Sequence, residues 1–227
     1  MLTRHALENG RGMILMPKSG TYSKVLFWFH GLGDDCNGWG SLMPQLGLAD
    51  TKFILPTAPE RPISLNGGWA MNGWSDILGL DDTIEEDRVG FDESAKMVNK
   101  LIQKEMEKGI PSEKISLGGF SQGGALALHV SLRSDVKLNS CVALSTWLPF
   151  RADFPASLSE NSKELPILQV HGKDDQVVAF PWGMGTNTLL KQMIPSTEFM
   201  AIDDMGHSSD PEEIDRVKLF LNTHLNK

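Results

Sequence analysis

Cysteine, basic clusters and long apolar runs are all scarce in this chain of 227 residues. Its two cysteines, Cys36 and Cys141, are too few for a disulfide framework, which favours a reducing compartment. The formal net charge is −8 and no run of Lys and Arg exceeds two residues, so nucleic-acid binding and charge-driven binding to anionic lipid are disfavoured. No apolar run is long enough to span a bilayer, and the first ten residues lack the apolar stretch of a signal peptide. We therefore expect a cytoplasmic protein without a transmembrane segment.

Short apolar runs alternate with helical patterns along the chain. Strands are predicted near 25–29, 53–55, 114–118, 141–144, 167–170 and 199–202. Helices are predicted near 83–108, 122–133, 182–193 and 211–225, the first beginning with a capping box of Thr83 and Glu86. The stretches 57–80 and 146–164 fit neither pattern. The alternation predicts an α/β fold with one mostly parallel, doubly wound sheet and helices on both faces, in a single domain over residues 1–227.

The string Gly119-Phe120-Ser121-Gln122-Gly123 matches G-x-S-x-G and lies between a predicted strand and a predicted helix. This context is typical of a nucleophile elbow, a sharp turn that exposes the serine hydroxyl. The backbone N–H after the serine can then face a developing oxyanion. The short pattern also arises by chance, so a plain glycine-rich turn with a buried serine is the alternative.

A serine hydroxyl is a poor nucleophile at neutral pH and needs a base. In α/β-hydrolases the chain order is serine, acid, histidine. His207 follows a predicted strand, at the edge where α/β sheets place ligand chemistry. His171 precedes the expected acid, which is the wrong order, and His224 lies in the predicted terminal helix. We therefore expect His207 to be the base; the alternative is a loop histidine paired with a neighbouring aspartate.

Two adjacent aspartates, Asp174 and Asp175, follow the strand predicted at 167–170. Only one of them can face the imidazole, because adjacent side chains point apart, and this reasoning leaves both open. For the oxyanion, the N–H groups of Leu32 and Gln122 are the expected donors, with an ordinary glycine turn at 31–33 as the alternative. No metal-binding or phosphate-binding motif occurs, so no metal or other cofactor is expected.

These strings together resemble the acyl-protein thioesterase family of α/β-hydrolases, also described as lysophospholipases or type 2 carboxylesterases. The resemblance covers roughly residues 26–221, and its matching strings are FHGLGD at 29–34, APERP at 58–62, WSDI at 74–77, GGFSQGGA at 118–125, ALSTWLP at 143–149, HG at 171–172 and GHSS at 206–209. The family pattern H-G-x-x-D-x-x-V falls on His171, Gly172, Asp175 and Val178. The resemblance thereby selects Asp175 as the acid.

The resemblance implies a serine hydrolase of the α/β-hydrolase fold with no large cap domain. It would remove palmitoyl-type groups from S-acylated protein cysteines through a Ser-His-Asp triad and an acyl-serine intermediate. A carboxylesterase or lysophospholipase acting on small esters or lysolipids is the alternative, and a non-catalytic acyl-ligand receptor is a more distant one.

The family's acyl groove maps onto five apolar residues, namely Trp74, Ile77, Leu78, Trp147 and Leu148. In the alternative, these residues fill an edge of the core. Expected partners are acylated proteins or lipid and ester substrates, with at most transient contact with a membrane surface. The protein is expected to be a monomer or a weak homodimer. Some relatives carry an acylated N-terminal cysteine, whereas the first cysteine here is Cys36.

Overall fold

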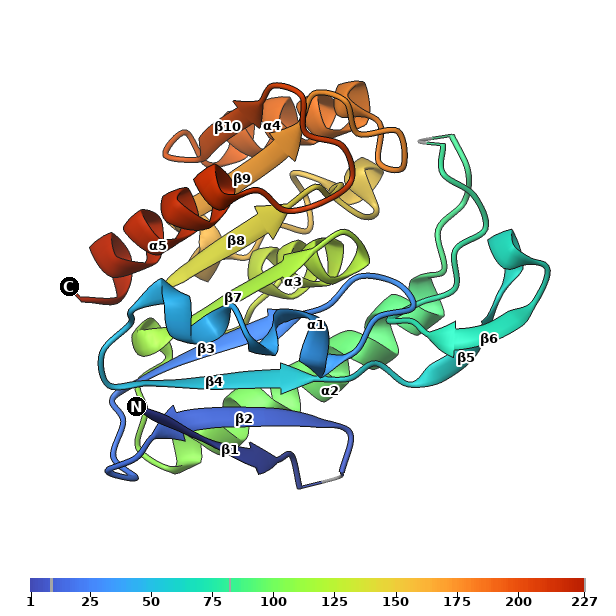
Figure 1. Ribbon diagram of the computed structural model, residues 1–227. Helices are drawn as coiled ribbons and strands as arrows, with labels where there is room; N and C mark the ends of the chain where they lie inside the picture. Colours follow the sequence, from blue (N-terminus) through green and yellow to red (C-terminus); the bar gives the residue numbers. More distant parts are fainter. Residues whose placement is uncertain (9, 82, 227) are drawn as a thin grey trace.

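The computed structural model describes residues 1–8, 10–81 and 83–226, and an eight-stranded sheet runs through its centre (Figure 1). The strand order is β1-β2-β4-β3-β7-β8-β9-β10. The strands are β1 (Leu2–Ala6), β2 (Gly12–Pro17), β3 (Lys24–Phe29), β4 (Thr51–Pro56), β7 (Ile115–Phe120), β8 (Ser140–Leu144), β9 (Ile167–Gly172) and β10 (Glu198–Ile202). From β4 to β10 the pairing is parallel, whereas β1 and β2 form an antiparallel hairpin at one edge.

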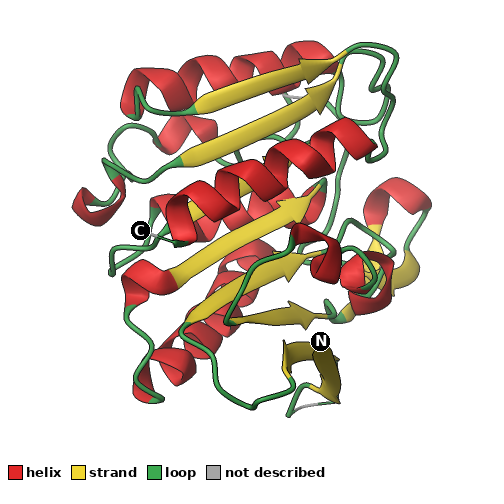
Figure 2. Ribbon diagram, turned by 60° about the vertical axis from the view of Figure 1, so that its left-hand side comes forward, coloured by secondary structure: helices red, strands yellow, loops and turns green. Residues whose placement is uncertain are grey.

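Helices cover both faces of this sheet (Figure 2). The α-helices are α1 (Cys36–Gly40), α2 (Arg88–Glu107), α3 (Gln122–Leu132), α4 (Phe180–Met193) and α5 (Pro211–Leu225). Five short 3₁₀ helices lie between them at Met43–Leu46, Ser64–Asn66, Ser112–Lys114, Arg151–Asp153 and Glu160–Ser162. None of the described helices is long and apolar enough to cross a membrane. The predicted α/β architecture, with a mostly parallel sheet between two helical layers, is confirmed.

Strand alternation divides the core into two layers. Successive side chains of a strand point to opposite faces of the sheet. In β3, Val25, Phe27 and Phe29 pack with the residues of α2 and α3. Leu26 and Trp28 pack on the other face with α1 and α5. A strand that is apolar on both faces, as the run at 25–29 predicted, is therefore an inner strand of a doubly covered sheet.

Helix α2 begins later than the sequence predicts. It starts at Arg88, and the cap is Asp87, whose carboxylate accepts the N–H of Gly90 at 3.0 Å. Glu86 is not the partner in a capping box with Thr83. Its carboxylate instead accepts the indole N–H of Trp147 at 2.7 Å and the backbone N–H of Phe150 at 2.6 Å.

The hairpin of β1 and β2 was not predicted, and the unassigned stretch 57–80 contains a second hairpin. Its strands are β5 (Glu60–Ile63) and β6 (Trp69–Asn72), which pair only with each other. This small hairpin projects beyond the carboxyl ends of the central strands (Figure 1). It therefore lies beside the edge of the sheet at which the sequence places the candidate site.

Candidate active site

Ser121 occupies the turn between β7 and α3, with φ 54° and ψ −125°. A non-glycine residue with positive φ is strained, and such strain is common at functional turns. The turn is tight because α3 packs directly against β3: a Cβ on Gly123 would lie 2.2 Å from the carbonyl oxygen of Phe29. The local geometry is therefore that of a nucleophile elbow, with the serine at its tip.

The imidazole of His207 lies beside this serine. His207 is in the loop between β10 and α5, and its Nε2 is 2.9 Å from the Ser121 hydroxyl oxygen. The ring also packs on Phe120, with ring centroids 4.8 Å apart. The Ser121 side chain is thus held against a base although 86 residues separate the two along the chain.

Asp175 completes the chain of hydrogen bonds. Its Oδ2 is 2.8 Å from Nδ1 of His207, and its Oδ1 accepts the N–H groups of Val177 and Val178 at 2.9 Å each. An imidazole that donates its Nδ1 proton to a carboxylate has a free lone pair on Nε2, where it can accept the serine proton. Asp174 is exposed, and its backbone N–H donates to Met205. The structure brings Asp175, and not Asp174, to His207.

His171 supports the turn that carries this aspartate. Its side chain is wholly buried, and its Nε2 lies 2.8 Å from the carbonyl oxygen of Val178 and 3.5 Å from Oδ2 of Asp175. Burial lowers the pKa of His171, so the ring is neutral and Nε2 carries the proton that it donates to Val178. His171 therefore lies behind the aspartate as a support.

The loop after β3 carries Leu32, one of the two expected oxyanion donors. His30 holds this loop, because its Nδ1 donates to the carbonyl of Gly31 at 2.6 Å and its Nε2 accepts the N–H of Ala58 at 3.0 Å. Leu32 and Gln122 line the same cleft as Ser121. Over the described ranges, neither of their backbone N–H groups donates to a backbone carbonyl. Both donors are thus available to an oxygen bound beside the serine.

The side chain of Gln122 was not singled out in the sequence, yet it ties the elbow to a second loop. Its Oε1 accepts the backbone N–H of Trp74 at 2.9 Å, and its Nε2 donates to the carbonyl of Ser75 at 2.9 Å. The indole N–H of Trp74 in turn donates to the carbonyl of His30 at 2.8 Å. The elbow, the loop after β3 and the loop 73–76 therefore form one rigid unit.

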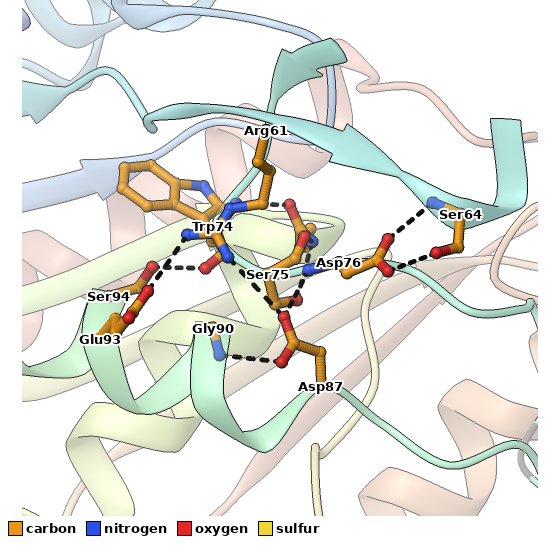
Figure 3. Close-up of polar contacts among 10 residues, drawn as sticks. Arg61, Ser64, Trp74, Ser75, Asp76, Asp87, Gly90, Glu93 and Ser94 are labelled. Atoms are coloured by element: carbon orange, nitrogen blue, oxygen red, sulfur yellow. Dashed lines mark hydrogen bonds and ion pairs between the residues drawn. The ribbon is translucent and has the colours of Figure 1, made fainter. Parts of the chain in front are cut away.

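A polar network extends this unit to the small hairpin and to α2 (Figure 3). The carboxylate of Asp76 accepts the backbone N–H of Ser64 at 2.7 Å, and the N–H of Asp76 donates to Asp87 at 2.8 Å. Arg61 of the hairpin lies 3.7 Å from the same Asp87 carboxylate. The hydroxyl of Ser94, on α2, donates to the carbonyl of Trp74. The sequence alone does not indicate the role of any residue in this network, because each hydrogen bond joins residues that only the tertiary fold brings together.

The serine and the histidine open into a cleft of about 430 Å³. Two of the five expected groove residues, Ile77 and Trp147, line it. Leu78 and Leu148 line a smaller adjacent pocket of about 40 Å³, which also includes Trp147. The apolar residues of the cleft that the sequence did not indicate are Trp39, Leu42, Leu65, Leu80, Phe120, Val177 and Val178. Apart from Phe120 at the end of β7, they come from loops and short helices, where hydrophobic periodicity gives no signal.

Trp74 does not line the cleft, although the sequence analysis expected it in the acyl groove. It is wholly buried and lines neither pocket. Its ring packs edge-on against Phe29 and lies beside His30, and its indole N–H is bonded to the His30 carbonyl. Because the indole N–H of Trp74 has a hydrogen-bond partner inside the protein, the whole side chain can stay buried. Trp74 therefore supports the site from within the core.

Comparison with known proteins agrees with this arrangement. Residues 12–225 match the phospholipase/carboxylesterase family. The chain is 39% identical to acyl-protein thioesterase 1 of Neurospora crassa, over 96% of this chain and 93% of that protein. It is also 39% identical to acyl-protein thioesterase 1 homolog 1 of Dictyostelium discoideum, over 91% of this chain and 93% of that protein.

Among solved structures, the acyl-protein thioesterase 2 of Zea mays superposes with a TM-score of 0.86 at 33% identity, covering 95% of this chain and 99% of the maize chain. The family match spans every strand from β2 to β10 and every residue of the hydrogen-bonded Ser121–His207–Asp175 chain. The protein therefore belongs to the phospholipase/carboxylesterase family of α/β-hydrolases, the enzyme family to which the sequence pointed.

Proposed function

We propose that this protein is a serine hydrolase that removes palmitoyl-type acyl groups from S-acylated cysteines of other proteins. One observation carries the proposal: a Ser-His-Asp hydrogen-bond chain opens into a largely apolar cleft of about 430 Å³. The identity to proteins named acyl-protein thioesterases supports the choice of a protein thioester as substrate. The mechanism uses the side chains and backbone of this chain alone.

In the first half-reaction, Ser121 Oγ attacks the acyl carbonyl while His207 Nε2 takes the hydroxyl proton. The N–H groups of Leu32 and Gln122 stabilise the oxyanion of the tetrahedral intermediate. The carbon–sulfur bond then breaks, and the imidazolium returns its proton to the leaving thiolate. Asp175 remains ionised and stabilises the imidazolium. The products of this half-reaction are the free protein thiol and acyl-Ser121.

In the second half-reaction, water attacks the acyl-serine carbonyl. His207 Nε2 accepts a proton from this water, and the same two N–H groups stabilise the second oxyanion. Collapse of the intermediate breaks the bond to Ser121 Oγ, which regains its proton from the imidazolium. The fatty acid leaves, and the hydrogen bonds at 2.8 Å and 2.9 Å around His207 are restored.

The carboxylesterase or lysophospholipase activity is the second candidate, because the same triad chemistry serves oxyesters and thioesters. The cleft favours a long chain, because its apolar wall residues, among them Trp39, Leu42 and Leu65, can bury methylene groups. A long acyl chain gains binding energy with every methylene that leaves water, by about 0.8 kcal/mol when fully buried. Chain-length dependence therefore separates the two candidates.

The test is turnover of acyl chains from acetyl to palmitoyl, as matched thioesters and oxyesters. We expect kcat/KM to rise with chain length and to be higher for thioesters. Ser121→Ala is the blank and should abolish turnover and fluorophosphonate labelling. Ser112→Ala, on the short 3₁₀ helix at the opposite end of β7, is the matched control. A rate that falls beyond butyryl would favour the carboxylesterase, and the absence of any Ser121-dependent rate would favour the receptor.

We also propose a location and an oligomeric state for the protein. It acts as one domain over residues 1–227 in the cytoplasm, where it meets acylated proteins with at most transient contact with membrane surfaces. Its expected state is a monomer or a weak homodimer. Size-exclusion chromatography with light scattering over a range of concentrations tests the oligomeric state, and fractionation of cells tests the location.

A further inference from the structure

A second cavity, of about 380 Å³, lies between α2 and the β1-β2-β4 end of the sheet. Its lining consists of five apolar residues and six charged ones, namely Leu7, Ile14, Ile54, Met97, Leu101, Glu8, Lys52, Lys100, Lys104, Glu105 and Lys108. It shares no residue with the cleft of Ser121. Nothing in the proposed hydrolysis uses it.

The floor of this cavity is apolar because of strand alternation. Ile14 of β2 and Ile54 of β4 are paired in register and face α2, where they meet the core layer beneath that helix. Met97 and Leu101 lie one helical turn apart on α2 and are only partly buried. The floor is therefore an aliphatic strip that is buried at Ile54 and only partly covered at Ile14 and along α2.

The charged part of the lining carries an excess of positive charge. Its four lysines against two glutamates give a net charge of +2, on a chain whose net charge is −8. Lys52 and Glu105 among them are buried. Glu105 is fully engaged, since Oε1 accepts both Lys52 and Lys108 at 2.8 Å and Oε2 accepts the Tyr22 hydroxyl at 2.9 Å. Two ammonium groups thus share one carboxylate, and a local positive charge remains.

Lys100 and Lys104 stand one turn apart on α2 at the mouth of the cavity. Over the residues that the structure describes, Lys100 forms no ion pair with an acidic side chain. Lys104 pairs with Glu8, whose side chain is 70% exposed. An exposed ion pair contributes at most about 1 kcal/mol, so an incoming anion can replace Glu8 at little expense.

We propose that this cavity is a binding site for a single-chain anionic amphiphile. The anionic head, a carboxylate or a phosphate, lies between the ammonium groups of Lys100 and Lys104. The alkyl chain lies along Ile14, Ile54 and Leu101. A volume of 380 Å³ is at the small end of ligand pockets, which suits one chain rather than a folded peptide or a protein segment. The site is separate from the proposed hydrolase chemistry and does not depend on it.

Met97 lines the cavity, so its methyl resonance offers a reporter of binding. The experiment titrates protein labelled with ¹³C at the methionine methyls with sodium laurate, and the Met97 signal is assigned from Met97→Leu. We expect laurate to shift this signal saturably. Dodecyl maltoside, which is neutral, and dodecyltrimethylammonium, which is cationic, should leave the signal in place. Dodecyl phosphate is titrated in parallel with laurate. Tighter binding of laurate indicates a fatty acid as the ligand, and tighter binding of dodecyl phosphate indicates a lysophospholipid-like phosphate.

The matched variants remove charge from one helix at different positions. Lys100→Gln with Lys104→Gln should raise the Kd for laurate at least tenfold, whereas Lys96→Gln should change it less than twofold. Lys96 is on α2 too, but it lines a different depression beside His129. An unshifted Met97 signal with laurate, an equal shift with the neutral or cationic detergent, or equal affinity in the double variant would each overturn the proposal. Turnover measured on the same samples reports separately on the hydrolase.

Discussion

Asp174 and Asp175 are neighbours in the chain with opposite environments. The Asp175 carboxylate is wholly buried, and two backbone N–H groups fix its Oδ1 so that Oδ2 faces His207. The side chain of Asp174 lies in solvent. Composition and spacing could not separate the two residues, because the difference arises from the path of the backbone through the turn. The family pattern did separate them, since it carries the spacing from His171.

Replacing Asp175 by asparagine should reduce kcat by about 10³- to 10⁴-fold, because the amide favours the wrong imidazole tautomer. The size of this effect is that of the serine-protease precedent. The measurement is the kcat of a long-chain thioester at saturating substrate, with Asp174→Asn as the matched control. The control should stay within about twofold of the parent, because its side chain is exposed. Equal losses of kcat in the two variants would show that the assignment of Asp175 as the acid is wrong.

Glu213 gives the fold a pH dependence of its own. Both of its carboxylate oxygens are buried without a hydrogen-bond partner in the described part of the chain. Burial, together with the charge of Asp210, raises the pKa of Glu213 from 4.5 to about 8. The folded state therefore binds a proton that the unfolded state releases between these values. Its stability falls as the pH rises from about 4.5 to about 8.

Glu213→Gln should remove this dependence, because the amide never ionises. We expect the free energy of unfolding to rise by up to about 5 kcal/mol at pH 8.5 and to change little at pH 4, given about 1.4 kcal/mol for each unit of pKa shift. Urea unfolding at the two pH values measures it. Glu212→Gln, an exposed neighbour in the same helical turn, should change stability by less than about 1 kcal/mol at both. A gain of equal size at pH 4 would point to packing as the cause.

At the scale of elements, the close approach of α3 to β3 sets the geometry of the elbow. Gly123→Ala would place a Cβ 2.2 Å from the Phe29 carbonyl, so the helix must move away and carry Ser121 and Gln122 with it. We expect kcat/KM to fall at least a hundredfold. Gly185→Ala on α4 is the control, since a Cβ there meets no atom within 4 Å, and it should stabilise the protein by about 0.5–1 kcal/mol. Full activity of the Gly123 variant would contradict this account of the turn.

Trp74 and Trp147 should respond differently to truncation. Trp74→Ala removes a buried ring and should lower the free energy of unfolding by about 3–5 kcal/mol, with a similar loss of kcat/KM for every chain length. Trp147 lines the cleft, so Trp147→Ala should reduce kcat/KM about tenfold more for palmitoyl than for acetyl substrates. Denaturant unfolding and the acyl series measure the two effects. A chain-length effect confined to the Trp74 variant would reverse these assignments.

The elements that the sequence predicted well are the inner strands and the terminal helix. Inner strands are apolar on both faces, and α5 begins as predicted at Pro211, with Asp210 as its cap. Strand β1 was missed because its side chains are exposed or half-buried, and the run LTRHA has no apolar period. The start of α2 was misplaced because the Thr83–Glu86 pair looks like a capping box in the sequence, whereas Asp87 is the cap. Glu86 is taken up by Trp147 and Phe150, which are far along the chain.

At the scale of the whole molecule, the candidate site is assembled from the carboxyl ends of four strands. Leu32, Ser121, Asp175 and His207 follow β3, β7, β9 and β10. Parallel strands bring such positions to one edge, so chain order and strand succession predicted that Leu32, Ser121 and His207 would meet. Only the family resemblance selected Asp175 over Asp174. The walls of the cleft were only partly predictable, because loops without periodicity supply them. The same reasoning could not find the lysine-rimmed cavity, since its lysines look like an ordinary solvated helix face.

The positive φ of Ser121 has a consequence for laboratory evolution. Glycine at position 121 would relieve a backbone strain of about 1–3 kcal/mol. Its greater freedom in the unfolded chain would offset about 0.5–1 kcal/mol of that gain in stability. Selection for thermal stability alone would therefore favour Ser121→Gly and would yield a more stable but inactive protein. Selection for turnover opposes the same change. Stabilising this enzyme without loss of activity means looking elsewhere in the chain, and Glu213 is the first place to look.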